Sequence, residues 1–501
     1  MDETKTGTRD ARDADRNAER EAALRLPEAE VRRLHWSGSA AAGGFDYDAS
    51  AEPIEVRTDE GELLGTMFSL GYLRVGDDGR VGGPERPVTF CYNGGPGSSS
   101  VPVNFGGMGP VTIETAGTQA LGMHPGTHDN PHTLLVDTDL VFLDALGTGW
   151  SRVAPGVKAS RVWGVDGDAD AFARAIVAWL DAHDRWASPV YLFGESYGTV
   201  RNAVLMRLLS ERGVDLAGVT MLSALFDFVQ TQPTSDLYHI GMLPTFAACA
   251  QWFDKAAGVG VGEDEWFDEA VEFAQGDYAH ALLLGDELPE REAARVARRY
   301  ARLTSLPAEF VRERNLRVEL DDFRRELLRA DGLVCGRLDM RFSSPAPQAL
   351  QRSTDAFAGE DAADAAVESA MLAAFRTHVR STLGYRGPAN YLLSNFEKVG
   401  GSWDWRHAQP GMDQTPIVNV CADIAQTLRV NPTMRLLVLG GRYDAATTWW
   451  NVRHDVAALH LAPSERERVE FRRYGCGHMA YIDAPTLKAM ASDLHEFYAR
   501  R

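Results

Sequence analysis

Short, almost uniformly apolar runs recur along the chain and alternate with segments of helical periodicity. Runs of this kind are typical of strands buried on both faces of a sheet, and helices between them favour a parallel sheet. Residues 52–76 instead alternate between apolar and polar positions and contain turn residues, which predicts antiparallel strands. The runs expected to form buried strands are PVTFCY at 87–92, DLVFLDAL at 139–146, PVYLFG at 189–194, DLAGVTML at 215–222, MRLLVLGG at 434–441 and RVEFRRYG at 468–475.

Amphipathic patterns at 168–183 and 200–213 predict two of the helices between these strands. The alternation stops between about 229 and 412, where the pattern is helical and irregular. Because strand-like runs resume afterwards, we interpret this segment as a cap inserted into an α/β core; an independent C-terminal domain is the alternative. The predicted parts are a polar N-terminal tail at 1–34, a first core part at 35–228, the cap at 229–412 and a second core part at 413–501.

Composition narrows the class of protein. Hydrophobic residues make up 45% and charged residues 24%, as in ordinary globular proteins, and the net charge of −20 argues against nucleic acid or an anionic membrane as a partner. The start of the chain is polar and does not resemble a secretory signal, and no apolar run reaches the roughly 18 residues of a transmembrane helix. The five cysteines form no C-x-x-C pair, which argues against a zinc finger or a disulfide framework and favours a reducing, cytoplasmic location.

A Gly-Glu-Ser-Tyr-Gly sequence lies at 194–198, between a predicted strand and a predicted helix. The pattern G-x-S-x-G is weak by itself, but in this position it matches a nucleophile elbow, a sharp turn that exposes a serine at a helix N-terminus. Ser196 is therefore the candidate nucleophile. The alternative is a buried serine in an ordinary strand–helix turn.

A serine hydroxyl is a weak nucleophile and needs a histidine base that an acid orients. In this type of fold the three residues follow one another as serine, acid and histidine, each after a strand. Asp444 follows the run at 434–441 and His478 follows the run at 468–475. Singly, Asp444 is more often a helix N-cap and His478 a loop histidine; together with Ser196 they are interpreted as a catalytic triad.

The run at 87–92 ends in Asn-Gly-Gly-Pro-Gly at 93–97. Acyl transfer needs hydrogen-bond donors for an oxyanion: one is expected from the backbone N–H of Tyr197, after the nucleophile, and the other from a glycine-rich loop. Gly94 and Gly95 have no Cβ atom, so their backbone can face a tetrahedral intermediate. A phosphate-binding loop is not indicated, because no Gly-Lys-Ser/Thr sequence follows.

Together these motifs resemble those of the serine carboxypeptidases, peptidase family S10. The resemblance rests on N-G-G-P-G-S-S at 93–99, G-E-S-Y-G at 194–198, an aspartate three residues after Gly-Gly at 444, G-H-M-x-x-x-D-x-P at 477–485 and D-N-P-H-T-L at 129–134. It implies an α/β-hydrolase fold, a mostly parallel sheet with helices on both faces, and a largely helical inserted cap domain.

The resemblance also implies roles for individual residues. The implied triad is Ser196, Asp444 and His478, and the implied oxyanion hole is Gly95 and Tyr197. The implied substrate-binding residues are Asn93 and Glu195 at the terminal carboxylate, Gly94 beside them, and Met479 near the leaving group.

The sequence departs from the family pattern at several positions. A second glutamate that shares a proton with the Glu of G-E-S-Y is replaced by Gly107, a tryptophan by Cys91, a disulfide cysteine by Ser98 and a proline by Tyr481. An ionised Glu195 without that partner would repel a substrate carboxylate, whereas a protonated one would not. An esterase or an acyltransferase therefore stays an alternative, and a catalytically silent binding protein is a further one.

The sequence thus predicts a serine-type carboxypeptidase that hydrolyses C-terminal peptide bonds through an acyl-enzyme on Ser196, without a cofactor or a metal. The expected partner is a peptide or a small acyl substrate. Neither nucleic acid nor a membrane is expected as a partner, and the assembly state is left open, a homodimer included.

Overall fold

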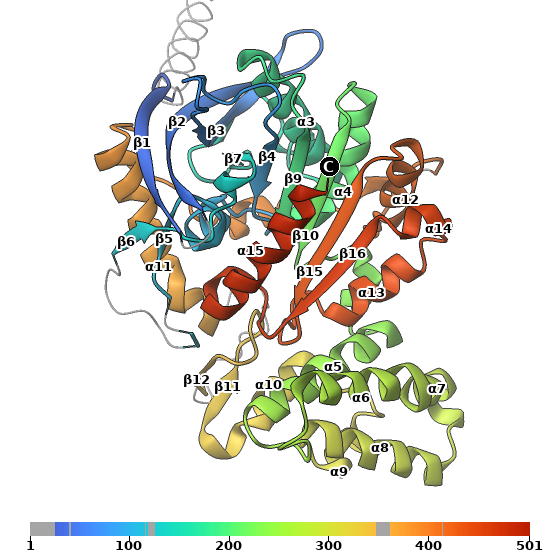
Figure 1. Ribbon diagram of the computed structural model, residues 1–501. Helices are drawn as coiled ribbons and strands as arrows, with labels where there is room; N and C mark the ends of the chain where they lie inside the picture. The colour runs from blue at the N-terminus through green and yellow to red at the C-terminus, as the bar shows by residue number, and fades with distance from the viewer. Residues whose placement is uncertain are drawn as a thin grey trace, which may run out of the picture.

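A mixed sheet forms the centre of the computed structural model, which describes residues 26–39, 42–115, 117–118, 126–346, 361–412 and 414–500 (Figure 1). Within these residues the strand order is β1-β2-β3-β7-β4-β9-β10-β15-β16, and β8 pairs with β3. The strands are β1 (Glu30–Gly38), β2 (Gly43–Arg57), β3 (Leu63–Arg74), β4 (Val88–Tyr92), β7 (Asp139–Leu143), β8 (Arg152–Val153), β9 (Val190–Glu195), β10 (Leu216–Leu222), β15 (Arg435–Gly441) and β16 (Val469–Tyr474).

The direction of the strands changes once across the sheet. β1, β2 and β3 are antiparallel to one another, and β3 is antiparallel to β7. From β7 through β4, β9, β10 and β15 to β16, all neighbours are parallel. The predicted strands are therefore confirmed, and the mostly parallel sheet is that of an α/β-hydrolase fold. β1 begins at Glu30, inside the predicted tail of 1–34; residues 1–25 lie outside the described residues.

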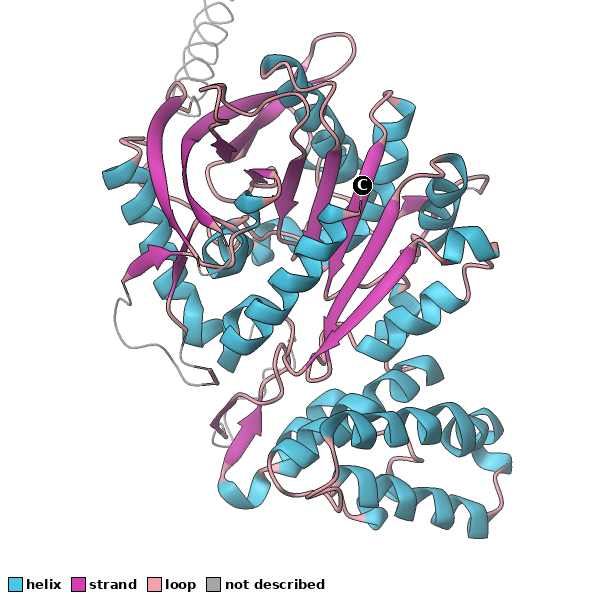
Figure 2. Cartoon of the chain, in the orientation of Figure 1, coloured by secondary structure: helices cyan, strands magenta, loops and turns pink. Residues whose placement is uncertain are grey.

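Helices cover both faces of this sheet (Figure 2). Successive strand side chains point to opposite faces, so on β4 the ring of Phe90 packs in one hydrophobic cluster and Cys91 packs in the other. The first cluster is completed by α3, α4, α12 and α13, and the second by α11 and α15. These helices are α3 (Val165–Ala182), α4 (Tyr197–Glu211), α11 (Ala362–Thr377), α12 (Cys421–Val430), α13 (Trp449–Ala457) and α15 (Ala484–Ala499).

A helical lobe lies below the ends of β15 and β16 in Figure 1. It has a hydrophobic core of its own, in which the rings of Phe246 and Phe323 stack at 4.1 Å. By contrast, α11 packs against the sheet. The segment 229–412 thus contains both this lobe and a part that lies on the core. The lobe comprises α5 (Asp236–Trp252), α6 (Glu263–Phe273), α7 (Ala279–Leu284), α8 (Glu290–Thr304), α9 (Ala308–Glu313) and α10 (Leu320–Leu327).

Shorter elements complete the described chain. Three hairpins lie outside the main sheet: β5 (Val111–Ile113) with β6 (Thr127–Asp129), β11 (Leu333–Cys335) with β12 (Ser343–Pro345), and β13 (His407–Ala408) with β14 (Gln414–Thr415). The short helices include α2 (Val101–Val103), α14 (Pro463–Arg466) and η10 (Ala480–Ile482).

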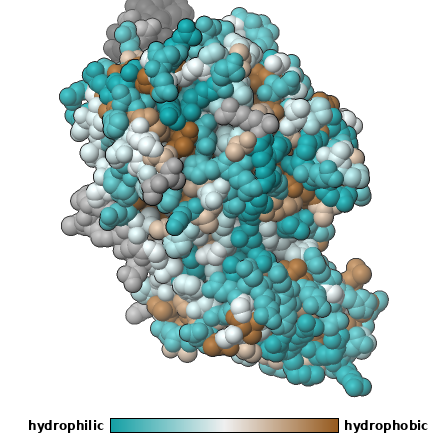
Figure 3. Space-filling view, viewed as in Figure 1, coloured by the Kyte–Doolittle hydropathy of each residue, from teal (hydrophilic) through white to brown (hydrophobic). Residues whose placement is uncertain are grey.

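The face of the molecule shown in Figure 3 is mostly hydrophilic, with hydrophobic residues in scattered spots. Across the described ranges, no helix combines the length and the apolar character that a membrane crossing requires.

Candidate active site

The turn between β9 and α4 has the geometry of a nucleophile elbow. Ser196 lies at this turn with φ +58° and ψ −128°, a backbone conformation that residues other than glycine rarely adopt. Its N–H donates a 2.9 Å hydrogen bond to the carbonyl oxygen of Leu222, the last residue of the neighbouring strand β10. This bond ties the unfavourable turn to the sheet and leaves the half-buried Ser196 at the N-cap of α4.

Asp444 and His478 follow β15 and β16 and lie next to each other. Nδ1 of His478 is 2.7 Å from Oδ2 of Asp444, and both side chains are buried. Burial acts to lower the pKa of His478, but the carboxylates of Asp444 and Glu195 outweigh it and raise that pKa above its ordinary value. Because Glu195 directly precedes Ser196, His478 lies within electrostatic reach of the elbow.

Further hydrogen bonds fix the carboxylate of Asp444. Its Oδ1 accepts from the backbone N–H groups of Ala446 at 2.8 Å and Thr447 at 3.0 Å. The Thr447 Oγ1 lies 2.8 Å from Asp444 Oδ2 and 2.9 Å from the carbonyl oxygen of Ser223, so two acceptors share its proton. The hydroxyl of Ser223 in turn donates to the carbonyl oxygen of His478 at 2.6 Å. Thr447 and Ser223 thus connect the two loops; sequence reasoning missed both, because neither belongs to a motif.

A second support comes from residues 336–342, which return from the helical lobe and are named the return segment here. The N–H of His478 donates to the carbonyl oxygen of Leu338 at 2.7 Å. The N–H of Gly477 donates to Oδ2 of Asp339 at 2.9 Å. The sequence interpretation placed this segment in the cap and gave it no role.

The Asn-Gly-Gly-Pro-Gly loop after β4 packs directly on the elbow. A Cβ atom at Gly94 would lie 2.4 Å from the backbone nitrogen of Tyr197, so no side chain fits there. Gly95 has a φ of +109°, which side chains rarely tolerate. Tyr197 is the first residue of α4, and the first N–H groups of a helix have no partner within it. The loop and the helix start therefore bring the two predicted oxyanion donors to the same edge of the sheet.

Asn93 and Glu195 form a buried polar network with Tyr481. Oε2 of Glu195 accepts hydrogen bonds from Asn93 Nδ2 at 2.5 Å and from the Tyr481 hydroxyl at 2.7 Å. The amide of Asn93 is held by the backbone N–H of Val103, which donates to its Oδ1 at 3.0 Å. Burial raises the pKa of Glu195 to about 7, against the lowering effects of His478 and Tyr481. Both protonation states of Glu195 are therefore populated near neutral pH.

Tyr481 occupies the space beside Gly107. A Cβ atom at Gly107 would lie 2.6 Å from the Tyr481 Cβ, and one at Gly106 would lie 2.3 Å from the Tyr481 Cδ2. The side chain of Tyr481 thus fills space next to Gly107, the position at which the family resemblance leads one to expect a glutamate. Met479 is buried in the same hydrophobic cluster as Tyr481.

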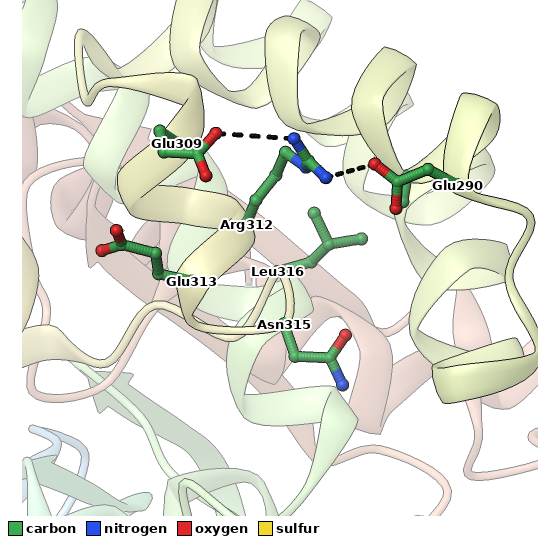
Figure 4. A pocket seen from close by; sticks show the side chains of 7 residues that line it. Glu290, Glu309, Arg312, Glu313, Asn315 and Leu316 are labelled. Atoms are coloured by element: carbon green, nitrogen blue, oxygen red, sulfur yellow. Dashed lines mark hydrogen bonds and ion pairs between the residues drawn. The ribbon is translucent and has the colours of Figure 1, made fainter.

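An open hollow on the helical lobe lies away from these residues (Figure 4). Its one guanidinium, that of Arg312, is paired with Glu290 and, at 3.4 Å, with Glu309. The hollow is lined by Glu290, Ala293, Glu309, Arg312, Glu313, Asn315 and Leu316. It contains none of the predicted site residues. Among the described residues, no group of three or more His, Cys, Asp or Glu side chains could hold a metal ion.

Comparison with protein families bears on the chemistry of this site. Residues 80–233 match the family model of the serine carboxypeptidases, a range that includes the Asn-Gly-Gly-Pro-Gly loop and Ser196 but neither Asp444 nor His478. The protein is an enzyme of the serine hydrolase type. No curated protein sequence matches the hydrolase.

Three of the solved structures that resemble the hydrolase are distant from it in sequence. A proline iminopeptidase from Mycobacterium smegmatis is 12% identical, with a TM-score of 0.32, over 90% of this chain and 99% of that chain. Est816, an N-acyl homoserine lactone degrading enzyme, is 15% identical, with a TM-score of 0.35, over 88% and 99%. An esterase from Pyrococcus furiosus is 11% identical, with a TM-score of 0.32, over 91% of each chain. These similarities are too remote to assign a substrate.

Proposed function

We propose that this hydrolase is a serine-type carboxypeptidase that cleaves C-terminal peptide bonds through an acyl-enzyme on Ser196. The main support is the buried pair of Asn93 and Glu195, in which Asn93 Nδ2 donates to Glu195 Oε2 at 2.5 Å. Asn93 begins the Asn-Gly-Gly-Pro-Gly loop, and Glu195 directly precedes Ser196. An amide N–H and a protonated carboxyl group are donors that suit a terminal carboxylate. A substrate held there has its last peptide bond next to the elbow.

In this mechanism the Oγ of Ser196 attacks the carbonyl carbon, and Nε2 of His478 accepts the hydroxyl proton. Asp444 orients the imidazole through Nδ1 and stabilises the imidazolium. The backbone N–H groups of Gly95 and Tyr197 donate to the oxyanion. His478 then gives its proton to the leaving amine, and water releases the acyl group from Ser196 by the reverse sequence.

The remaining predicted residues bind the leaving part of the substrate. Asn93 and Glu195 donate to its carboxylate, the backbone of Gly94 forms the adjoining wall, and Met479 contacts its side chain. None of these steps calls on a cofactor or a metal. The proposed partner is a peptide or a small acyl compound.

An esterase or acyltransferase using the same triad is the second candidate. It is favoured by the fraction of Glu195 that stays ionised near neutral pH, with a pKa of about 7, because the ionised form repels a substrate carboxylate. A neutral ester meets no such repulsion. The two candidates therefore differ in the charge of the substrate end rather than in the nucleophile.

Two measurements test the proposal. A fluorophosphonate should label the wild-type protein and not Ser196→Ala; an intact wild-type fold that is not labelled would contradict the assignment of the nucleophile. Release of C-terminal amino acids from blocked dipeptides should be detectable between about pH 4 and about pH 8. Turnover of p-nitrophenyl esters without any release from dipeptides would establish the esterase instead.

A further inference from the structure

The hydroxyl of Tyr481 is hydrogen-bonded to the carboxyl group of Glu195. In the proposed function this carboxyl group binds the terminal carboxylate of the substrate. It donates to Glu195 Oε2 at 2.7 Å, and Asn93 Nδ2 lies 3.5 Å from the Tyr481 oxygen. Asn93 also donates to the same Glu195 oxygen, so the three side chains close a triangle. All three are buried, where hydrogen bonds and charges interact more strongly than at the surface.

Packing fixes the position of the Tyr481 ring. A Cβ atom at Gly106 would lie 2.3 Å from the ring atom Cδ2, and one at Gly107 would lie 2.6 Å from the Tyr481 Cβ, so the side chain packs against both glycines. The residue belongs to the short helix η10, three positions after His478. The hydroxyl is therefore held against Glu195 by the ring contacts, and a change at Tyr481 reaches the substrate site without altering Ser196, Asp444 or His478.

Three charged groups from separate parts of the described chain act on the pKa of Glu195. His478, after β16, acts to lower the pKa of Glu195, while Asp364 on α11 and Asp444, after β15, act to raise it. The pKa of Asp364 is itself raised to about 7, by burial and then by Asp361. Tyr481 contributes a neutral donor, which favours the ionised form of Glu195.

We propose that Tyr481 is a specificity-determining residue, whose hydroxyl sets the pH up to which the site accepts a substrate that ends in a carboxylate. A protonated Glu195 donates to such a carboxylate, whereas an ionised Glu195 repels it. The Tyr481 hydroxyl stabilises the ionised form of Glu195 and so narrows the pH range in which the site binds a substrate carboxylate. Without it, Glu195 keeps its proton to higher pH. The inference rests on the proposed role of Glu195 in binding the substrate end.

The test compares two substrates that differ only in the charge of that end. kcat/KM is measured for a blocked dipeptide with a free C-terminal carboxylate and for the same dipeptide as its C-terminal amide, from about pH 5 to about pH 9. The quantity of interest is kcat/KM for the carboxylate substrate divided by kcat/KM for the amide. Because both substrates need the same base, the titration of His478 cancels in this ratio. In the wild-type enzyme the ratio should fall as pH rises through about 7, the pKa of Glu195.

Two variants change the pH dependence of this ratio in different ways. Tyr481→Phe keeps the ring and should move the midpoint of the fall upward by about one pH unit. Glu195→Gln cannot ionise and should make the ratio independent of pH. Tyr474→Phe is the matched control, because the Tyr474 hydroxyl also donates to a carboxylate, that of Asp493 at 2.7 Å, and it should leave the midpoint unchanged.

The proposal is overturned if Tyr481→Phe has the wild-type midpoint or a lower one, or if the ratio still falls with pH in Glu195→Gln. A failure of the proposed function is recognised separately. In that case neither dipeptide is cleaved while Ser196 is still labelled by the fluorophosphonate. The same ratio is then measured with a pair of esters: an acylated hydroxy acid with a free carboxylate, and its amide. The midpoints of the wild type and of Tyr481→Phe again decide the role of Tyr481.

Discussion

Asp339 accepts a 2.9 Å hydrogen bond from the backbone N–H of Gly477, the residue before His478. Asp339 belongs to the return segment, and it also forms a buried ion pair with Arg341 at 2.6 Å. The chain that leaves the sheet to build the helical lobe thus comes back to support the loop that bears the candidate base. The helical lobe and the catalytic loop are therefore coupled through the carboxylate of Asp339, beside the hydrogen bond from the His478 N–H to the Leu338 carbonyl oxygen.

Replacing Asp339 with alanine should reduce both stability and turnover. The variant leaves the buried guanidinium of Arg341 without its main partner, which typically costs about 3–5 kcal/mol, and it frees the Gly477 N–H. Urea denaturation and kcat measure the two effects. The control is Asp78→Ala, since the exposed pair of Asp78 and Arg80 should contribute less than about 1 kcal/mol. Equal losses in the two variants would count against a supporting role for Asp339.

Thr447→Val should lower kcat by about tenfold while Thr447→Ser stays close to wild type. Valine keeps the shape of threonine but removes the hydroxyl shared by Asp444 Oδ2 and the Ser223 carbonyl, and a buried acceptor without its donor costs about 1–3 kcal/mol. Steady-state kinetics with a p-nitrophenyl ester measure the change. The prediction fails if the valine variant retains full activity or if serine does not rescue it.

Gly94→Ala should lower kcat by about 10²-fold, the size of effect seen when an oxyanion donor is lost. The added Cβ would lie 2.4 Å from the Tyr197 nitrogen, so the loop and the helix start must move apart. Gly83→Ala is the control, because nothing lies within 4 Å of a Cβ at that position. Similar kinetics for the two variants would show that the loop tolerates the displacement.

Protonated His407 should stabilise the fold at acidic and neutral pH, and this stabilisation should be lost at alkaline pH. Its Nδ1 lies 2.6 Å from Asp166 and its Nε2 lies 2.8 Å from Asp423. Burial acts to lower its pKa, but the hydrogen bonds with these two carboxylates raise it to about 9, above the roughly 6.5 of an unfolded histidine. The stabilisation is therefore fully present below about pH 6.5 and is lost as pH rises through about 9.

The variant His407→Gln tests this pH dependence. The difference in unfolding free energy between wild type and variant should be on the order of 2 kcal/mol at about pH 6 and should shrink towards about pH 10. Chemical denaturation at a series of pH values measures it. His280→Gln, at an exposed position on α7, should show no such trend. A difference for His407→Gln that stays constant with pH would contradict the proposed charge on His407.

The strands and the elbow could be predicted because their requirements are local. A strand buried on both faces needs apolar side chains at nearly every position, and the runs at 87–92 and 434–441 became β4 and β15 for that reason. A nucleophile elbow needs a strand, a tight turn and a helix within a few residues, and 189–213 contains all three. The match of residues 80–233 to a family model reflects the same local motifs.

The sequence alone determined the α/β arrangement and the order of Ser196, Asp444 and His478 along parallel strands, because apolar periodicity and turn chemistry act over short distances. Only the tertiary structure decided which side chains surround these residues. Asp339 comes from the return segment and contacts the Gly477 N–H, and Tyr481 comes from η10 and contacts the Glu195 carboxyl group. No local sequence pattern predicts either contact. Gly107 shows the physical reason. Its neighbour across space, the side chain of Tyr481, lies far from it in the sequence, and that side chain fits only because residue 107 has no Cβ atom. The fit places the Tyr481 hydroxyl against Glu195.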